Sequence, residues 1–222
     1  RREVSTSAIY RTLVTLTHMG YLNKSNSHYE LGARVVSDGF SYLASRDIVD
    51  VAMPHLNALR DRTSLSCHLS IREHTDSLYL YRAFAAQRLS VNIPVVTRIA
   101  CHCTAMGRML LSGLDDARLG ALYQHIRLDD YPAPAPRTLP ELQTMIREDR
   151  ERGWVLHRSD YSTAIATSIR DHTGQVTAAI NLSGPDAVMD PDGAKQHFQS
   201  LLLETSACIS RELGYRAASP FA

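Results

Sequence analysis

The hydrophobic positions near the start of the chain repeat with a helical period and then change to a strand-like one. Four apolar residues share one face of a helix over residues 5–19, at i, i+4, i+7 and i+10 spacing: Ile9, Leu13, Leu16 and Met19. Ser5 or Thr6 can cap its first turn, and Gly20 is expected to end it. Two short stretches at 21–24 and 28–32 flank a polar turn at 25–27 and predict a hairpin.

Two further helices are expected over residues 33–46 and 47–62. The helix over 33–46 is expected to point four apolar side chains inward: Val35, Val36, Phe40 and Leu43. Pro54 lies inside the second helix. We expect a kink or a restart there, because proline has no amide hydrogen and its ring clashes with the preceding turn.

The remaining chain mixes strand and helix patterns. Residues 65–72 alternate apolar and polar side chains, which predicts a strand with one buried face. Further strands are expected at 78–84, 89–95, 154–156, 164–169 and 175–183. Further helices are expected at 104–111, 115–124, 138–152 and 192–214, with an exposed proline loop at 132–136. Strands surrounded by grouped helices predict an α+β fold.

Composition indicates a folded, cytoplasmic protein. The 222 residues are 44% hydrophobic and 21% charged, and they contain no run near the roughly 18 apolar residues of a membrane span. Four irregularly spaced cysteines do not suggest a disulfide framework, so we expect a reduced environment. The chain opens at Arg1 without a secretory leader, and an upstream piece is expected to be missing.

The first helix carries candidate DNA contacts on the side opposite its apolar stripe. Residues 1–46 contain six basic and three acidic residues, a mild excess that suits nucleic acid. Arginine can grip a guanine edge or a phosphate, serine can reach a phosphate, and valine can touch a thymine methyl. The candidate residues are Thr6, Ser7, Tyr10, Arg11, Val14 and, in the hairpin, Lys24. A solvated polar face on an ordinary amphipathic helix would explain the same spacing.

The segments VSTSAIYRTL at 4–13, GYL at 20–22 and YELG at 29–32 resemble, in order, the DNA-binding part of the IclR-type family of bacterial transcriptional regulators. The body is matched by AMPHL at 52–56, HCTAMGR at 102–108, RERGW at 150–154, NLSGP at 181–185 and ISRELGY at 209–215. Together these matches cover nearly the whole chain.

That resemblance implies three parts. Residues 1–32 would be the second half of a winged helix-turn-helix whose first two helices precede Arg1, residues 33–46 a linker helix, and residues 47–222 a GAF-like effector-binding domain. A helix-turn-helix that reads two half-sites needs a two-fold dimer, for which the apolar stripe of the linker helix is a candidate seam. The resemblance adds a tetramer through the effector domains.

The effector is expected to be a small organic acid, aliphatic or aromatic. Thr104, Ala105 and Gly107 open a helix whose unpaired amides suit a carboxylate, and Gly107 would let the ligand approach the backbone. Asn181 and Ser183 share one face of their strand, while the side chains at 176, 178, 180 and 182 take the other. The simpler alternative is that Thr104 is only a cap and the polar pair only faces water.

The family pattern adds further effector candidates, at positions where this sequence departs from it. His157 falls near the family's acidic position, and Asp160 follows it. The segment that contains them is about three residues shorter than in the family pattern, and Ala164 replaces the family's cysteine. Ala164 widens the pocket and favours a tail that is bulkier or less polar than glyoxylate. Arg108 is expected to point away from the ligand, so the amides at 104–107 should neutralise the acid.

Metal, cofactor and catalytic sites are not expected. Cys101-His102-Cys103 lacks the C-x-x-C spacing and a second pair to close a tetrahedral zinc site, although His157 and His172 could add ligands. The sequence contains no G-x-S-x-G elbow, P-loop or H-E-x-x-H motif. We therefore expect a ligand-responsive regulator that binds operator DNA and is not an enzyme. The alternative is a small-molecule-binding sensory module without DNA binding.

Overall fold

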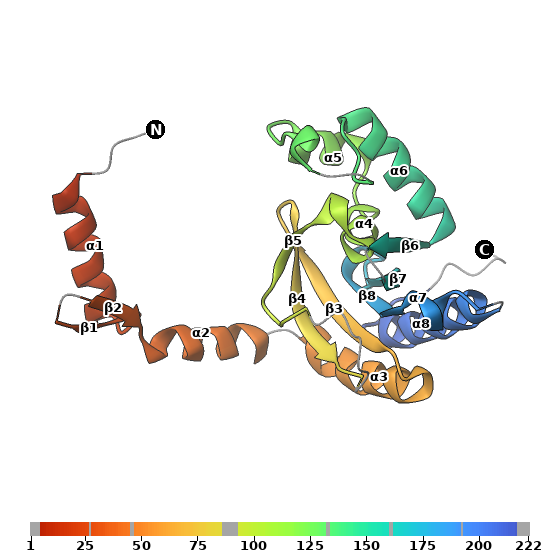
Figure 1. Ribbon diagram of the computed structural model, residues 1–222, viewed down its shortest axis with the longest axis horizontal. Helices are drawn as coiled ribbons and strands as arrows, with labels where there is room; N and C mark the ends of the chain where they lie inside the picture. The colour runs from red at the N-terminus through yellow and green to blue at the C-terminus, as the bar shows by residue number, and fades with distance from the viewer. Residues whose placement is uncertain are drawn as a thin grey trace. The chain divides into compact units, whose positions relative to one another are not determined.

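The chain folds into two compact units, residues 1–47 and 48–222, which are described separately. The computed structural model describes residues 5–26, 28–44, 47–85, 93–131, 134–159, 162–191 and 193–216, without the side chains of 39–44 and 47. Figure 1 shows the elements of both units. Asp160 and the side chains of Phe40 and Leu43 therefore lie outside the description.

The first unit consists of a helix, a hairpin and a second helix, as the sequence predicts. Its elements are α1 (Thr6–His18), β1 (Leu22–Ser25), β2 (His28–Leu31) and α2 (Ala33–Ala44). The Ser5 hydroxyl caps α1 by accepting a hydrogen bond from the amide of Ala8 at 3.3 Å. The two strands pair antiparallel, with Lys24 opposite Tyr29. Val35 and Val36 of α2 are exposed rather than turned inward.

A polar clamp joins the hairpin to α2. The Tyr21 hydroxyl donates to Asp38 Oδ2 at 2.6 Å, and Arg34 Nε donates to Asp38 Oδ1 at 3.0 Å. The hydrogen bond to Asp38 raises the pKa of Tyr21. Gly32 lies so close to Gly20 that an added Cβ would stand 2.1 Å from the Gly20 carbonyl oxygen. These contacts fix the approach of the hairpin to the start of α2.

The second unit is built on one antiparallel sheet with the strand order β5-β4-β3-β8-β7-β6. The strands are β3 (Ser66–Glu73), β4 (Asp76–Ala83), β5 (Arg98–Ala100), β6 (Trp154–Ser159), β7 (Ser162–Arg170) and β8 (Val176–Pro185). The helices are α3 (Asp47–Thr63), α4 (Ala105–Leu111), α5 (Asp116–Tyr123), α6 (Leu139–Arg152), α7 (Asp186–Met189) and α8 (Ala194–Glu212), with 3₁₀ turns η1 (Cys101–Cys103) and η2 (Leu128–Asp130). The mixed α+β class is confirmed.

Helices cover both faces of this sheet. Figure 1 shows α4, α5 and α6 on one side and α3 and α8 on the other. Residues 66–71 of β3 are consequently buried on both faces, and the prediction of a single buried face was wrong. The polar side chains His68 and Ser70 lie under α4, where the Ser70 hydroxyl contacts Met106 Sδ at 3.5 Å.

Three local predictions were also wrong. The described part of the predicted strand 89–95 is not a strand, and β5 forms instead at Arg98–Ala100; residues 86–92 lie outside the description. Helix α3 continues through Pro54 without a restart, and Pro54 is exposed, so that water can solvate the carbonyl that proline leaves unbonded. Val176 packs with the core under α4, because a bulge at Thr177 reverses the alternation of β8.

Candidate functional site

One face of the sheet brings together four of the predicted effector residues. Ala164 of β7 pairs with Ser183 of β8 on one side and with His157 of β6 on the other. Asn181, two residues before Ser183, pairs with Ala166, which belongs to the core under α4. Cross-strand partners share a face, so these side chains lie on the α4 side of the sheet.

Asn181 is held by a histidine that sequence analysis missed. Its Oδ1 accepts from the His68 backbone amide at 3.1 Å and lies 2.9 Å from His68 Nδ1. An amide oxygen has no hydrogen, so Nδ1 must donate, and the NH₂ group of Asn181 is what remains for a ligand. Burial lowers the pKa of His68 to about 4, which keeps the ring neutral at pH 7. Only the register of β3 on β8 could have revealed this pair.

The start of α4 is built differently from the sequence prediction. The Thr104 hydroxyl accepts from the Gly107 amide at 3.0 Å, so Thr104 is the N-cap and one of the predicted ligand-binding amides is already occupied. An added Cβ on Gly107 would lie 2.2 Å from the Cys101 carbonyl oxygen. The missing side chain of Gly107 therefore lets the protein's own backbone approach, not a ligand. Ala105 is buried beside it.

A cavity of about 610 Å³ lies along β6 and contains His157. Its other lining residues come from η1, α4, α6, β6 and the proline loop: His102, Cys103, Arg108, Pro134, Ala135, Met145, Leu156, Arg158 and Ser159. Arg108, which we expected to point away from the site, lines the same cavity as His157. Burial, then the charge of Arg108, lowers the pKa of His157.

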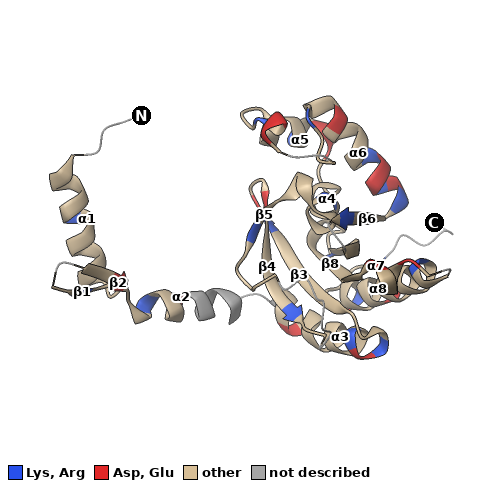
Figure 2. Ribbon diagram, in the orientation of Figure 1, with Lys and Arg blue, Asp and Glu red and all other residues tan. Residues whose placement is uncertain are grey.

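Two ion-pair clusters hold the arginines of this cavity. The Asp149 carboxylate is 0% exposed and accepts from Arg108 Nε and Nη2, both at 2.7 Å, and from Arg152 Nη2 at 2.9 Å. Arg158 Nη2 donates to Asp190 Oδ1 at 2.5 Å, and Lys195 Nζ lies 2.9 Å from the same oxygen. Each carboxylate is thus shared by two cations. Figure 2 shows a basic residue at the end of β6 and no acidic residue on that strand.

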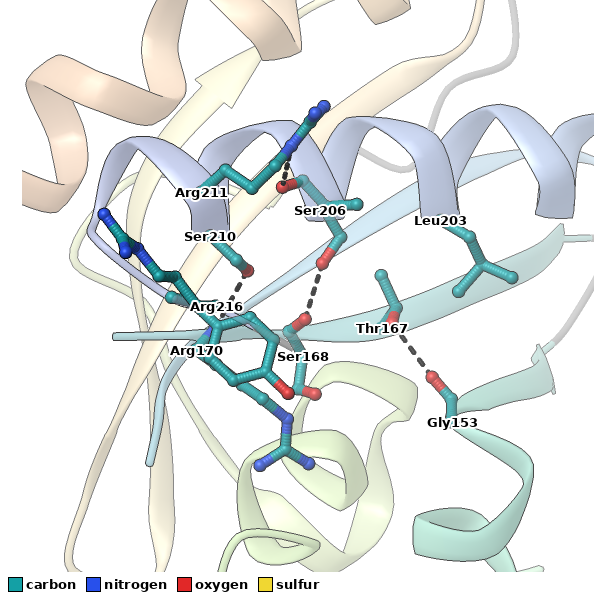
Figure 3. Close-up of a pocket in the computed structure, with 11 residues that line it drawn as sticks. Gly153, Thr167, Ser168, Arg170, Leu203, Ser206, Ser210, Arg211 and Arg216 are labelled. Atoms are coloured by element: carbon teal, nitrogen blue, oxygen red, sulfur yellow. Dashed lines mark hydrogen bonds between the residues drawn. The ribbon is translucent and has the colours of Figure 1, made fainter. Parts of the chain in front are cut away.

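A second cavity, of about 460 Å³, lies between α8 and β7. Figure 3 shows that two of its hydroxyl groups already bond within the protein: Ser206 donates to the Ser168 carbonyl at 2.6 Å and Thr167 to the Gly153 carbonyl at 2.9 Å. Its arginine side chains point away from one another in the same view. None of the predicted effector residues lines this cavity.

The predicted DNA-contacting residues are all exposed on the first unit. On α1 they are Thr6, Ser7, Tyr10, Arg11 and Val14, and Lys24 lies on β1. The apolar stripe of α1 is not covered either, since the helix has no buried residue and Ile9 is 49% exposed. Lys24 Nζ lies 5.9 Å from the ring centroid of Tyr29, which places its charge at the hairpin.

The Cys101-His102-Cys103 segment forms η1, in which Cys101 and His102 are buried. Burial raises the pKa of Cys101 to about 12, so this thiol stays protonated at pH 7. Within the described residues no group of three or more histidine, cysteine or acidic side chains could hold a metal ion. No helix among them is long and apolar enough to cross a membrane.

Comparison with solved structures places the fold among bacterial transcriptional regulators. A regulator from Rhodococcus sp. RHA1 is 28% identical, with a TM-score of 0.71 over 95% of this chain and 86% of that chain. An IclR homologue from Microbacterium hydrocarbonoxydans, solved with 4-hydroxybenzoate, is 21% identical, with a TM-score of 0.73 over the same shares of the two chains.

Comparison of sequences identifies a protein family that the chain matches. The family described as "Bacterial transcriptional regulator IclR C-terminal" matches residues 40–211. The Pca regulon regulatory protein of Pseudomonas putida is 30% identical in an alignment 220 positions long that covers 96% of this chain and 75% of the relative. The regulator XynR of Escherichia coli K12 is 28% identical over 96% of this chain and 86% of the relative. The chain therefore belongs to the IclR family of bacterial transcriptional regulators.

Proposed function

We propose that this regulator binds operator DNA through a winged helix at residues 1–32 and a small organic acid in the domain of residues 47–222. The observation that carries the proposal is the pairing of an exposed polar helix and hairpin with a separate unit whose sheet face gathers His157, Ala164, Asn181 and Ser183. The protein would act in the cytoplasm without catalysing a reaction.

For DNA binding, α1 would lie in the major groove and the hairpin against the phosphate backbone. The exposed Arg11 and Ser7 share the polar side of α1, and Lys24 carries a positive charge on the hairpin. Binding two half-sites requires a two-fold dimer. The exposed Val35 and Val36 on the linker helix (residues 33–46) are candidates for its seam, and the effector domains could extend the assembly to a tetramer.

Replacing Arg11 with alanine is expected to weaken operator binding by about 1–3 kcal/mol, because one guanidinium contact to a base or phosphate is lost. A gel shift with the intact regulator at fixed salt would measure the change. Arg62→Ala is the control, since Arg62 is an exposed arginine of α3 in the other unit. Equal binding by wild type and the Arg11 variant would exclude Arg11 as a contact. Absence of any sequence-specific shift would favour a sensory module without DNA binding.

For effector binding, the chemistry of the sheet face suits a polar, oxygen-bearing ligand. The Asn181 NH₂ group can donate to a carbonyl or carboxylate oxygen, and the Ser183 hydroxyl can donate or accept. Ala164 pairs with both Ser183 and His157, and its small side chain adds little bulk between them. A structural neighbour was solved with 4-hydroxybenzoate, an acid that combines a carboxylate and a hydroxyl on an apolar ring. Ala105 and Asp160 complete the proposed set of effector-binding residues, because the Thr104 hydroxyl and the Gly107 amide are already bonded to each other.

Ser183→Ala is expected to weaken acid binding about fivefold to tenfold, because a neutral hydrogen bond contributes about 1 kcal/mol. Thermal-shift screening of small aliphatic and aromatic acids would find the ligand, and calorimetry would compare the variants. Asn181→Ala should act in the same direction, although it also leaves His68 without its partner. Ser200→Ala on the exposed side of α8 is the matched control. Intact acid binding in both site variants would place the ligand elsewhere.

A further inference from the structure

We propose that Arg108 and His102 bind the carboxylate of the effector inside the cavity along β6. The proposal rests on the proposed function, because it assigns a place to the acid group of the same ligand. The amides at the start of α4 were the sequence-based candidates for this role. In the structure the Gly107 amide is occupied by Thr104, whereas Arg108 lines a cavity of about 610 Å³.

The charge around this cavity favours an anion. Two arginines line it, and none of its described lining residues is acidic. The carboxylates that pair with these arginines are each shared with a second cation, Arg152 at Asp149 and Lys195 at Asp190. Each cluster therefore holds two positive charges and one negative charge. A ligand carboxylate would offset that excess, and screening by water is weaker at Arg108, whose side chain is 18% exposed, than at Arg158, whose side chain is 51% exposed.

The Arg108 guanidinium is already ordered for binding. Its side chain is 18% exposed, and Asp149 accepts from Nε and Nη2. A guanidinium has five N–H donors, so the Nη1 amino group remains for a ligand oxygen. Because Asp149 fixes the side chain beforehand, the ligand does not have to immobilise a free arginine.

His102, which also lines the cavity, supplies a second donor. It is 2% exposed, and its Nε2 has no hydrogen-bond partner among the described residues. Its Nδ1 lies 3.4 Å from the Tyr123 hydroxyl, and the rings of Tyr123 and Tyr131 contact it edge-on. If Tyr123 donates to Nδ1, the single proton of the neutral ring is on Nε2. A carboxylate oxygen would then satisfy a buried donor that is costly to leave unpaired.

The other lining residues indicate the chemical character of the ligand beyond its carboxylate. Pro134, Ala135, Met145 and Leu156 contribute apolar surface, and the volume falls within the usual range for small-molecule sites. We therefore assign the cavity to a compact monocarboxylate with an apolar body. His157 lies in the cavity and also pairs with Ala164 on the sheet face, which makes it the residue common to both regions.

The test compares acids with their uncharged amides by calorimetry on the intact protein at fixed pH and ionic strength. The probes are benzoate, phenylacetate and butyrate, each paired with its amide. At least one acid should bind wild type more tightly than its amide, and Arg108→Gln should weaken that acid at least tenfold while leaving the amide unchanged. Arg152→Gln is the matched control, because it removes the other guanidinium from Asp149 without touching the cavity.

A second variant keeps the proposal testable if Arg108→Gln does not fold. His157→Asp places a negative charge in the cavity and should also weaken the acid at least tenfold. If both variants bind the acid like wild type while Ser183→Ala does not, the carboxylate lies on the sheet face; the proposal is then overturned and the proposed function stands. If none of the acids binds wild type, the assignment of the carboxylate to this cavity and the organic-acid part of the proposed function are both overturned, while operator binding is decided by the gel shift.

Discussion

Replacing Asp149 with alanine is expected to lower the free energy of unfolding of the second unit by about 3–5 kcal/mol, the usual cost of breaking a buried ion pair by removing one partner. The Asp149 carboxylate is 0% exposed and accepts three hydrogen bonds, two from Arg108 and one from Arg152. Without it, the partly buried Arg108 loses its fixed counter-charge. Urea unfolding followed by circular dichroism would measure the change.

Two variants separate the buried charge from other properties of α6. Asp149→Asn keeps the shape of the side chain and should lose less stability than Asp149→Ala, since its oxygen can still accept one hydrogen bond. Glu148→Ala removes an exposed acid one residue earlier and should change stability by less than about 0.5 kcal/mol. A loss below 1 kcal/mol for Asp149→Ala would mean that this ion pair does not stabilise the domain.

Replacing Gly107 with alanine is expected to lower stability by about 3 kcal/mol, at the upper end of overpacking costs. The new Cβ would lie 2.2 Å from the carbonyl oxygen of Cys101 and 2.3 Å from its Cα. Both are backbone atoms, so no side-chain rotation can relieve the overlap. The turn η1 and the start of α4 would have to separate, which would also disturb His102 on the wall of the cavity.

The control is another helical glycine with free space around it. Gly120 lies in α5, and a Cβ there would meet nothing closer than 3.9 Å. Gly120→Ala should raise stability by about 0.5–1 kcal/mol, because alanine favours the helix more than glycine does. Thermal unfolding of both variants beside wild type would test the opposite signs. Equal effects would mean that the approach of Gly107 to Cys101 is not tight.

Local chemistry in the sequence predicted the local structure well. The caps at Ser5 and Thr138 and the left-handed Gly153 delimit α1 and α6 close to the predicted residues. Contacts between residues far apart in the sequence could not be predicted. Asp149 meets Arg108 across 41 residues and Asn181 meets His68 across 113 residues, and no periodic pattern encodes such contacts.

Small backbone irregularities explain other differences from prediction. The bulge at Thr177 places Val176 under α4, although strict alternation would put it on the opposite face. The close approach of Cys101 gives Gly107 a packing role that its sequence context does not reveal. In both places the position of one backbone segment against another decides which side chains face the site.

The bond between His68 and Asn181 has a consequence for how this regulator can diverge. Asn181 Oδ1 serves both the backbone amide and the ring of His68, so the asparagine supports β3 and faces the site at the same time. A change at position 181 that alters ligand preference also removes the partner of a buried ring. Descendants that acquire a new specificity through this position should therefore inherit a compensating change at position 68.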